Sequence, residues 1–309
     1  MPRKVILDMD PGIGEAIALG LALGDPRLEV IAVTATGGAV GPRQATRNVQ
    51  ALIERIDPAR RPRIGAASEN QTLRTDARHL YGEDGLGGAV LPVADLVHRH
   101  ASIKVIGDEV RAAPGELTII TTGPLSNLAS VLQAEPDLAP AIGHLIICGG
   151  AVAEPGDITA AAEFNVFCDP DSARAVLRSP VTKTLVPLDV TRKVRMGIDW
   201  LEQLRKQRSG AAQLLQELLP GAFRAHRQRL AMEDIFVHEA VAVTLALHPE
   251  LFTLERLFGD VECSGDLTVG ATVFDLRPRP ESPPNLDVAT DLDAAGVIDC
   301  LLRGVAAAA

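Results

Sequence analysis

Short apolar runs alternate with helical segments along this 309-residue chain, and this alternation limits the possible folds most strongly. Residues 28–35 form an apolar run rich in β-branched side chains, and a helical pattern opened by Pro42 follows it. Buried strands of a parallel sheet have this composition because helices cover both of their faces. The pattern predicts an α/β fold with a single large, open, mostly parallel twisted sheet flanked by helices. No repeat or linker divides the chain, so we expect one domain over residues 1–309.

The same pattern gives the expected elements. Strands are predicted at residues 4–9, 28–35, 117–122, 144–148, 184–188, 257–263, 268–276 and 285–289. Helices are predicted from residue 14 onward and at 42–56, 102–112, 124–133, 171–177 and 291–305, and a helical pattern broken near 209–210 and 220–221 covers 198–248. Residues 60–67 are expected to form a loop. Residues 69–94, which include the sequence GEDGLGG, are expected to form a long ordered loop with a functional role.

Charge, hydropathy and cysteine content limit the classes of partner that we expect and the cellular compartment in which we expect the protein. The formal net charge of −10 argues against a nucleic-acid partner, because phosphate contacts need clustered Lys and Arg. No apolar run reaches membrane-spanning length, so we expect no membrane partner. The cysteines Cys148, Cys168, Cys263 and Cys300 are far apart in sequence, which favours buried free thiols in a reducing compartment. The first residues turn acidic too soon for a secretory segment, and we expect a cytoplasmic protein.

The sequence LDMDPGIGEAIAL, residues 7–19, carries three acidic side chains across a predicted strand, turn and helix. Asp8 and Asp10 are two residues apart, so they point to the same side of a strand, and Glu15 lies about one turn into the helix. Converging carboxylates repel one another unless a positive charge lies between them, and a hard divalent cation is a common solution. The alternative is that Asp10 caps the helix and Asp8 is a solvated strand end.

Several other residues with special chemistry also follow predicted strands. In open α/β sheets, ligands bind beyond the carboxyl ends of the strands. This rule groups the acids of residues 7–19 with the turns at Gly37, Thr122-Gly123 and Gly149-Gly150 and with Asp189. We therefore expect one site at this edge of the sheet.

An ordered set of motifs resembles the calcium-dependent nucleoside hydrolases, the inosine-uridine-preferring ribohydrolase family. The motifs are DxDPG with an acidic helix start, TTGPLSNLA at 121–129, GGA at 149–151, AEFN at 162–165 with Asp169-Pro170, LDVT at 188–191 and His238-Glu239. The resemblance runs from Val5 to about Asp287. It implies cleavage of the N-glycosidic bond of ribonucleosides, or of a related N-riboside, to ribose and free base by a metal-activated water. It also implies a small nucleoside-like substrate, a role in purine or pyrimidine salvage, and a homodimer or homotetramer.

The resemblance implies a Ca²⁺ site. By similarity, Asp10 is a metal ligand and the general base, Glu15 and Glu239 stand where the family has aspartate ligands, and the main-chain carbonyl of Thr122 completes the protein ligands. Asp8 supports this end of the site. A bound Ca²⁺ lowers the pKa of the attacking water and orients the ribose diol.

The resemblance also implies the substrate contacts. Glu163, Phe164 and Asn165 match substrate-binding positions, and His238 matches the acid that protonates the leaving base. We expect the neighbouring Glu239 carboxylate to favour the protonated form of His238.

Each of these motifs has a structural alternative. Thr122-Gly123-Pro124 can be only a strand-to-helix turn, and AEFN a loop in which Phe164 is a hydrophobic plug and Asn165 bonds its own backbone. His238 can be a core histidine. Asp169-Pro170 is expected to be a helix-entry turn, and Asp189 a strand-end acid that orients its neighbours.

The chain departs from the family pattern at the site itself. Gly14 and Ala39 replace an aspartate and an asparagine, Tyr81 replaces a histidine, Asp157 replaces an asparagine, and two metal ligands are glutamates in place of aspartates. Each lost hydrogen bond to a charged group is worth roughly 1.5–3 kcal/mol, which predicts a weakened or retuned hydrolase. One hypothesis is that Gly14 provides the slack that the longer Glu15 needs.

Two other functions compete with this prediction. The first is a catalytically weak or inactive homologue that binds a nucleoside-like ligand, which Gly14 and Ala39 favour. The second is a phosphatase with an aspartate nucleophile in a DxD motif, which shares Asp8 and Asp10. The phosphatase is disfavoured because Gly12 stands where such enzymes have a threonine.

Overall fold

The computed structural model describes residues 2–93 and 100–307. Within these residues a nine-stranded sheet has the order β10-β13-β7-β6-β5-β1-β2-β3-β4. Every neighbouring pair is parallel except β10 and β13. The strands are β1 Arg3–Met9, β2 Leu28–Ala35, β3 Arg63–Ala66, β4 His100–Ala101, β5 Thr118–Thr121, β6 His144–Cys148, β7 Lys183–Val186, β10 Phe252–Leu257 and β13 Leu286–Leu292. The predicted open, mostly parallel sheet is confirmed.

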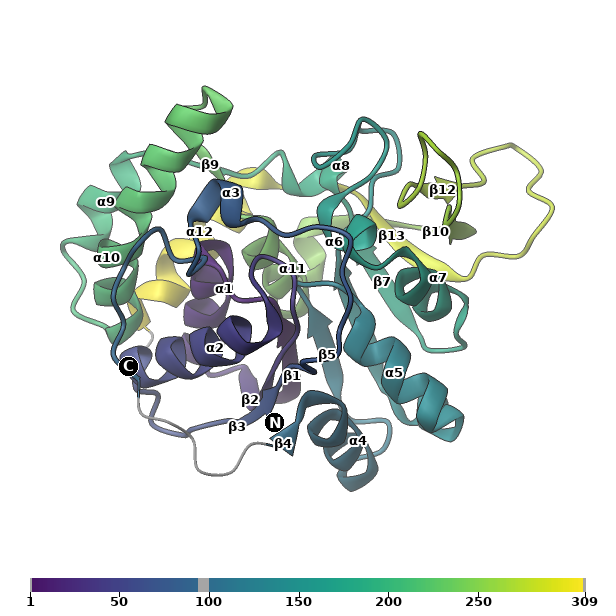
Figure 1. Cartoon of the computed structure of the whole chain (residues 1–309), viewed down its shortest axis with the longest axis horizontal. Coiled ribbons are helices and arrows are strands. Elements are labelled where there is room, and N and C mark those ends of the chain that lie inside the picture. The colour runs from purple at the N-terminus through teal and green to yellow at the C-terminus, as the bar shows by residue number, and fades with distance from the viewer. Residues whose placement is uncertain (1, 94–99, 308–309) are drawn as a thin grey trace.

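Helices cover both faces of this sheet (Figure 1). On one face α1 Ile13–Gly24, α2 Pro42–Ile56 and α11 His238–Leu247 pack on the strands. Helices α10 Gly210–Ala225 and α12 Ala294–Ala307 pack on α1 and belong to the same hydrophobic core. The other face packs against α4 Ser102–Ala112, α5 Ser126–Ala134 and α7 Pro170–Arg178. Helix α1 contacts α10, α11 and α12 as well as the sheet, and this explains why its residues are apolar on nearly every side.

Smaller elements surround the sheet. Strands β8 Arg195–Met196 and β9 Ile235–Phe236 form one antiparallel pair, and β11 Gly259–Val261 and β12 Thr272–Phe274 form another. The short helices are α3 Arg78–Tyr81, α6 Phe164–Cys168, α8 Leu188–Thr191, α9 Asp199–Leu204, the 3-10 turns at Pro136–Ala141 and Pro249–Leu251, and a π-helical turn at His226–Leu230.

The strand order reverses direction beside β1. The chain passes from β1 through β2 and β3 to β4 on one side, and then from β5 through β6 to β7 on the other. The two halves meet between β1 and β5, where Asp8 pairs in register with Thr121. Ligands of such sheets bind at this kind of switch point, outside the carboxyl ends of the strands.

The first helix begins where the sequence predicts. Gly12 is its N-terminal cap, and the Glu15 carboxylate accepts a hydrogen bond of 2.9 Å from the Gly12 N–H. A glutamate at the third helical position therefore satisfies one of the N–H groups left unpaired at the helix start. The same carboxylate lies at the predicted site.

Several predicted elements are confirmed with the same bounds, namely residues 28–35, 42–56, 102–112 and 144–148. Other predictions are wrong. Residues 60–67 contain β3, and the sequence did not indicate this strand because it begins with the polar Arg63. Helix α10 continues through Pro220, because its apolar side is buried in the core. Residues 257–263 are not one strand, since Gly259 begins a separate hairpin, and the stretch 198–248 contains β8's partner β9.

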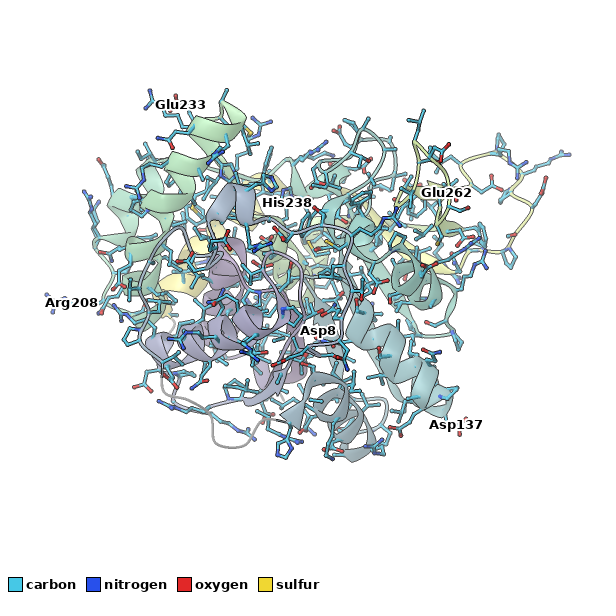
Figure 2. All side chains as sticks on the ribbon, viewed as in Figure 1. Asp8, Asp137, Arg208, Glu233, His238 and Glu262 are labelled. Atoms are coloured by element: carbon cyan, nitrogen blue, oxygen red, sulfur yellow. The ribbon has the colours of Figure 1, made fainter. Side chains whose placement is uncertain are left out.

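Three further expectations concern loops, cysteines and membranes. Residues 69–93 are mostly irregular and include α3, while residue 94 of the expected loop lies outside the described residues. All four cysteines are free, and Cys148, Cys168 and Cys300 are buried. Across the described ranges, no helix combines the length and apolar character needed to cross a bilayer. Labelled charged residues such as Arg208 and Glu233 lie at the periphery in Figure 2, whereas Asp8 and His238 lie nearer the middle of the molecule.

The contact between α2 and α10 leaves no room for a side chain at the start of α10. A Cβ placed on Gly210 would lie 2.2 Å from the carbonyl oxygen of Ile56. Gly210→Ala is therefore expected to destabilise the protein by about 1–3 kcal/mol, measured by urea unfolding. The control is Gly41→Ala, where a Cβ meets no atom of the described residues within 4 Å. Equal stability of the two variants would contradict this account of the contact.

Candidate active site

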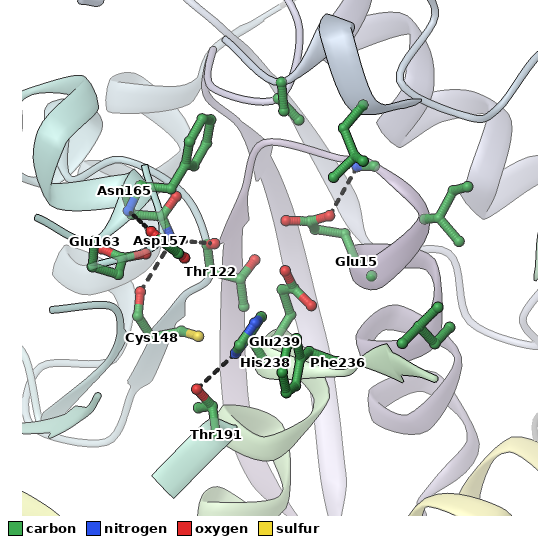
Figure 3. A pocket seen from close by; sticks show the side chains of 18 of the residues that line it. Glu15, Thr122, Cys148, Asp157, Glu163, Asn165, Thr191, Phe236, His238 and Glu239 are labelled. Atoms are coloured by element: carbon green, nitrogen blue, oxygen red, sulfur yellow. Dashed lines mark hydrogen bonds between the residues drawn. The ribbon is translucent and has the colours of Figure 1, made fainter. Parts of the chain in front are cut away.

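A pocket of about 480 Å³ lies at the carboxyl ends of β1, β5 and β6, at the switch point of the sheet. Its walls come from segments far apart in the sequence (Figure 3). Most of the sequence-predicted site residues line it, and these are Asp10, Glu15, Thr122, Glu163, Phe164, Asn165, His238 and Glu239. The fold therefore brings together the residues that the motifs singled out.

Asp10 lies just beyond β1, and two glycines enclose its carboxylate. A Cβ on Gly38 would lie 2.0 Å from Asp10 Oδ2, and a Cβ on Gly123 would lie 2.6 Å from Asp10 Oδ1. Oδ2 accepts a 2.7 Å hydrogen bond from the Ala39 N–H. Oδ1 is buried and has no hydrogen-bond partner within the described part of the chain. The carboxylate is therefore fixed by one oxygen, and the other is left for a ligand.

Asp8 lies beneath the pocket and does not line it. Its Oδ1 accepts hydrogen bonds from Thr34 Oγ1 at 2.6 Å and Asn127 Nδ2 at 2.8 Å. Asn127 also donates to the Ala35 carbonyl at the end of β2. Burial raises the pKa of Asp8 to about 6. Asp8 is thus not a solvated strand end; it ties β1, β2 and α5 together below Asp10.

Glu15 and Glu239 point into the same part of the pocket (Figure 3), and Asp10, which also lines the pocket, interacts electrostatically with both. Burial raises the pKa of Asp10 to about 8, and the Glu239 charge adds to this shift. Burial, together with the neighbouring Asp10, raises the pKa of Glu15 well above its usual range, and burial and Glu15 do the same for Glu239. Three like charges in a buried space cannot all remain ionised unless a cation compensates them.

The donor chemistry of this cluster fits a hard cation such as Ca²⁺. The available atoms are carboxylate oxygens, including the unpaired Asp10 Oδ1, and oxygens are the ligands that Ca²⁺ prefers. The side chains are not already arranged as a complete ligand set: across residues 2–93 and 100–307, no three His, Cys, Asp or Glu residues form a metal-binding group. Glu15 Oε2 accepts its hydrogen bond from the Gly12 N–H.

Gly14 faces Glu239 and not Glu15. The three nearest atoms to a Cβ placed on Gly14 all belong to the Glu239 carboxyl group. The hypothesis that Gly14 provides slack for the longer Glu15 stays a prediction, and the open side of the glycine points across to Glu239 on α11. The glutamate at position 239 uses this space.

The Asn165 amide joins two strand ends. Its Nδ2 donates to the carbonyl of Thr122 at 2.8 Å and to the carbonyl of Cys148 at 3.2 Å (Figure 3). The predicted alternative, in which Asn165 bonds its own backbone, is wrong. The Thr122 carbonyl lies at the pocket wall, and the Thr122 hydroxyl is buried without a partner among the described residues.

Glu163 caps α6, a helix that the sequence did not predict. Its Oε2 accepts hydrogen bonds of 3.0 Å from the N–H groups of Gly150 and Val166. Burial raises the pKa of Glu163 to about 8, and the charge of Asp157 adds to this effect. Asp157 in turn accepts a 2.8 Å hydrogen bond from the Phe164 N–H. Phe164 is only partly buried at the pocket wall, so it does not act as a plug.

His238 begins α11, and Thr191 of the LDVT motif fixes its ring. His238 Nδ1 lies 2.7 Å from Thr191 Oγ1, and the ring of Phe236 lies 5.1 Å from the imidazole ring (Figure 3). Burial lowers the pKa of His238 to about 3, and the positive charge of Arg192 contributes. The expectation that Glu239 keeps His238 protonated is therefore wrong, because desolvation outweighs the neighbouring carboxylate.

Asp189 of α8 and Arg192, which follows this helix, hold the loop at 151–162 beside the pocket. Asp189 accepts hydrogen bonds from the N–H groups of Val152, Ala153 and Glu154 at 2.8–3.2 Å. Arg192 donates to the carbonyls of Pro155 and Gly156 at 2.9 and 3.0 Å. The prediction that Asp189 orients its neighbours is confirmed. Asp169, as predicted, starts a helix, because it caps α7 through a 3.1 Å bond from the Ser172 N–H.

Sequence reasoning missed part of the pocket wall. Thr191, Arg192, His226 and Phe236 all line the pocket, and Tyr81, noted only as a departure from the family pattern, lies 6.0 Å from the His226 ring. The LDVT motif gave a signal for Thr191. His226 gave none, because a π-helical turn after α10 places it, and such turns have no sequence period of their own.

A pocket that contains several carboxylates, at the switch point of a parallel sheet, is typical of a site for a small molecule. Residues 5–299 match the sequence model of the family described as inosine-uridine preferring nucleoside hydrolase. The pyrimidine-specific ribonucleoside hydrolase RihA of Salmonella paratyphi B is 33% identical over 307 residues, which cover 97% of each chain. The protein belongs to this nucleoside hydrolase family.

Solved structures agree. A purine-preferring ribonucleoside hydrolase from Gardnerella vaginalis has a TM-score of 0.90 at 25% identity, over 99% of this chain and 98% of that one. A plant nucleoside hydrolase has a TM-score of 0.91 at 29% identity, over 99% and 100%. The predicted family and fold are thus confirmed, and the enzyme hydrolyses the N-glycosidic bond of ribonucleosides to give ribose and free base.

The Thr191–His238 contact predicts an effect on turnover. Thr191→Val keeps the shape of the side chain but removes the hydroxyl that fixes the imidazole, so we expect kcat to fall about tenfold with little change in KM. Thr191→Ser, which keeps the hydroxyl, is the matched control and should retain most of the activity. Steady-state kinetics with a nucleoside substrate measures both, and equal loss in the two variants would contradict the orienting role.

Proposed function

We propose that this enzyme is a Ca²⁺-dependent ribonucleoside hydrolase in which Asp10 is the general base. One observation carries the proposal: Asp10 Oδ1 is buried without a hydrogen-bond partner in the described residues, at the switch point of the sheet and beside Glu15 and Glu239. Such an oxygen is costly unless a cation or a water occupies the space next to it.

The ligand set that we propose for Ca²⁺ is Asp10, Glu15, Glu239 and the main-chain carbonyl of Thr122. Glu15 would have to turn from the Gly12 N–H toward the pocket, a rotation of its own side chain. When bound, the cation supplies positive charge that lowers the pKa of a nearby water and offsets the repulsion among the carboxylates.

The protein's own groups divide the remaining tasks. Asp10 takes the proton of the attacking water, with Ala39 holding its other oxygen and Asp8 tying down the strand below. Glu163, Phe164 and Asn165 bind the sugar, and the bonds of Glu163 to the Gly150 and Val166 N–H groups fix it in advance.

We infer that His238 assists the leaving base as a neutral imidazole. Its ring is held at Nδ1 by Thr191, and its pKa is low because it is buried. If the Thr191 hydroxyl donates to Nδ1, then Nε2 carries the hydrogen and donates it to the base as negative charge develops there. This differs from a fully protonated histidine acid.

The names of the relatives guide the choice of base. The curated relatives at 31–33% identity over 97% of the chain are named pyrimidine-specific, whereas one solved structure at 25% identity is named purine-preferring. We therefore propose a preference for pyrimidine ribonucleosides. We also propose that residues 1–309 form one domain, and that the enzyme is a cytoplasmic homodimer or homotetramer active in nucleoside salvage.

A nucleoside panel tests the proposal. Ribose release from uridine, cytidine and inosine is measured with Ca²⁺, after chelation, and with Asp10→Asn. We expect the pyrimidine nucleosides to be cleaved faster, and both chelation and Asp10→Asn to lower kcat by about 10²-fold or more, because base catalysis contributes this much. Full activity after chelation would refute the metal, and ligand binding without turnover would favour an inactive homologue.

A second test separates the leaving-group role of His238 from a structural one. His238→Ala should lower kcat for uridine by about 10²-fold, but it should change the hydrolysis of p-nitrophenyl riboside little, because that leaving group departs as a stable anion. Equal losses for both substrates would show that the residue only shapes the pocket.

A further inference from the structure

Gly14 and Glu239 occupy complementary space at the metal end of the pocket. A Cβ placed on Gly14 would lie 2.3 Å from Glu239 Oε2, 2.7 Å from its Cδ and 3.0 Å from its Oε1. Real Cβ atoms essentially never lie within 3.0 Å of other atoms, so a side chain at position 14 would displace the Glu239 carboxylate from its present place.

The two residues come from different helices. Gly14 lies in the first turn of α1 and Glu239 in the first turn of α11, and these helices pack against each other. The Glu239 carboxylate therefore reaches over the start of α1, where the helix dipole favours negative charge. Its neighbours there are Glu15 on α1 and Tyr81, whose pKa is raised by burial, with the Glu239 and Glu15 charges adding to the shift.

We propose that Gly14 is a positioning residue for Glu239: the missing side chain admits the longer carboxylate from α11 into the space beside Glu15, where it contributes to cation binding. The inference rests on the proposed Ca²⁺ site. An aspartate at position 239 would end roughly 1.5 Å short, one carbon–carbon bond, and would leave this space empty. Gly14 therefore leaves the space that the longer side chain of Glu239 occupies.

A double-mutant cycle tests the pairing. The variants are Gly14→Ala, Glu239→Asp and Gly14→Ala/Glu239→Asp, with Gly41→Ala as the control for a glycine-to-alanine change in open space. Calcium affinity is measured by calorimetry on the full-length protein, and thermal unfolding is measured without metal. Neither readout depends on turnover.

Gly14→Ala should weaken Ca²⁺ binding by about tenfold or more, as changes that displace a ligand usually do. The same change in the Glu239→Asp background should cost less than about threefold, because the shorter side chain leaves room for the methyl group. In the metal-free protein, Gly14→Ala should lower the melting temperature more in the wild-type background than with Asp at 239. Gly41→Ala should leave Ca²⁺ affinity unchanged.

Wild-type affinity in Gly14→Ala, or equal losses in both backgrounds, would overturn the pairing while the hydrolase stands. Absence of Ca²⁺ binding in the wild type would instead overturn the proposed metal site, and the pairing with it. If Gly14→Ala does not fold, recovery of folding in the double variant supports the pairing. A double variant that also fails to fold contradicts it.

Discussion

Repulsion among buried carboxylates is the constraint around which this pocket is built. Asp10, Glu15 and Glu239 share one end of a cavity, and burial raises the pKa of each. In a medium of low polarity such charges are tolerated only with a compensating cation or with bound protons. The arrangement is thus incomplete by itself, and this need for a positive charge links the architecture of the sheet to metal-assisted hydrolysis.

Apart from the three clustered carboxylates, hydrogen bonds to the backbone hold the site residues in place. Side chains bond to the backbone around the pocket: Asn165 joins the ends of β5 and β6, and Glu163 caps α6. Asp189 holds the loop above the pocket through three N–H groups. These contacts fix the frame before substrate arrives, so binding energy is not spent on ordering loops. Glycines at 38 and 123 enclose Asp10 because no Cβ would fit there.

Departures from the family pattern have different meanings once they are placed in space. Gly14 first suggested a lost contact, yet its open side is filled by Glu239. Asp157 is not a stray charge, since it bonds the Phe164 N–H and raises the pKa of Glu163. His238, which matches the family pattern, is held by Thr191, and burial lowers its pKa. A residue that is an isolated departure in the sequence, such as Gly14, can therefore fit together with a second residue, such as Glu239, in the structure.

The sequence by itself determined the α/β class and the bounds of strands such as 28–35 and 144–148, because period and turn residues are local properties. Strand-end position indicated Asp10 and Thr122 as pocket residues, and the resemblance to the family indicated Glu163, His238 and Glu239. It could not determine the contacts across helices. That Gly14 faces Glu239, that Asn165 joins Thr122 to Cys148, and that His226 reaches the pocket were decided only by tertiary packing. The protonation state of His238 was also decided by tertiary packing. Its pKa depends on desolvation, and desolvation depends on all the groups around the imidazole, of which the neighbours in sequence are a small part.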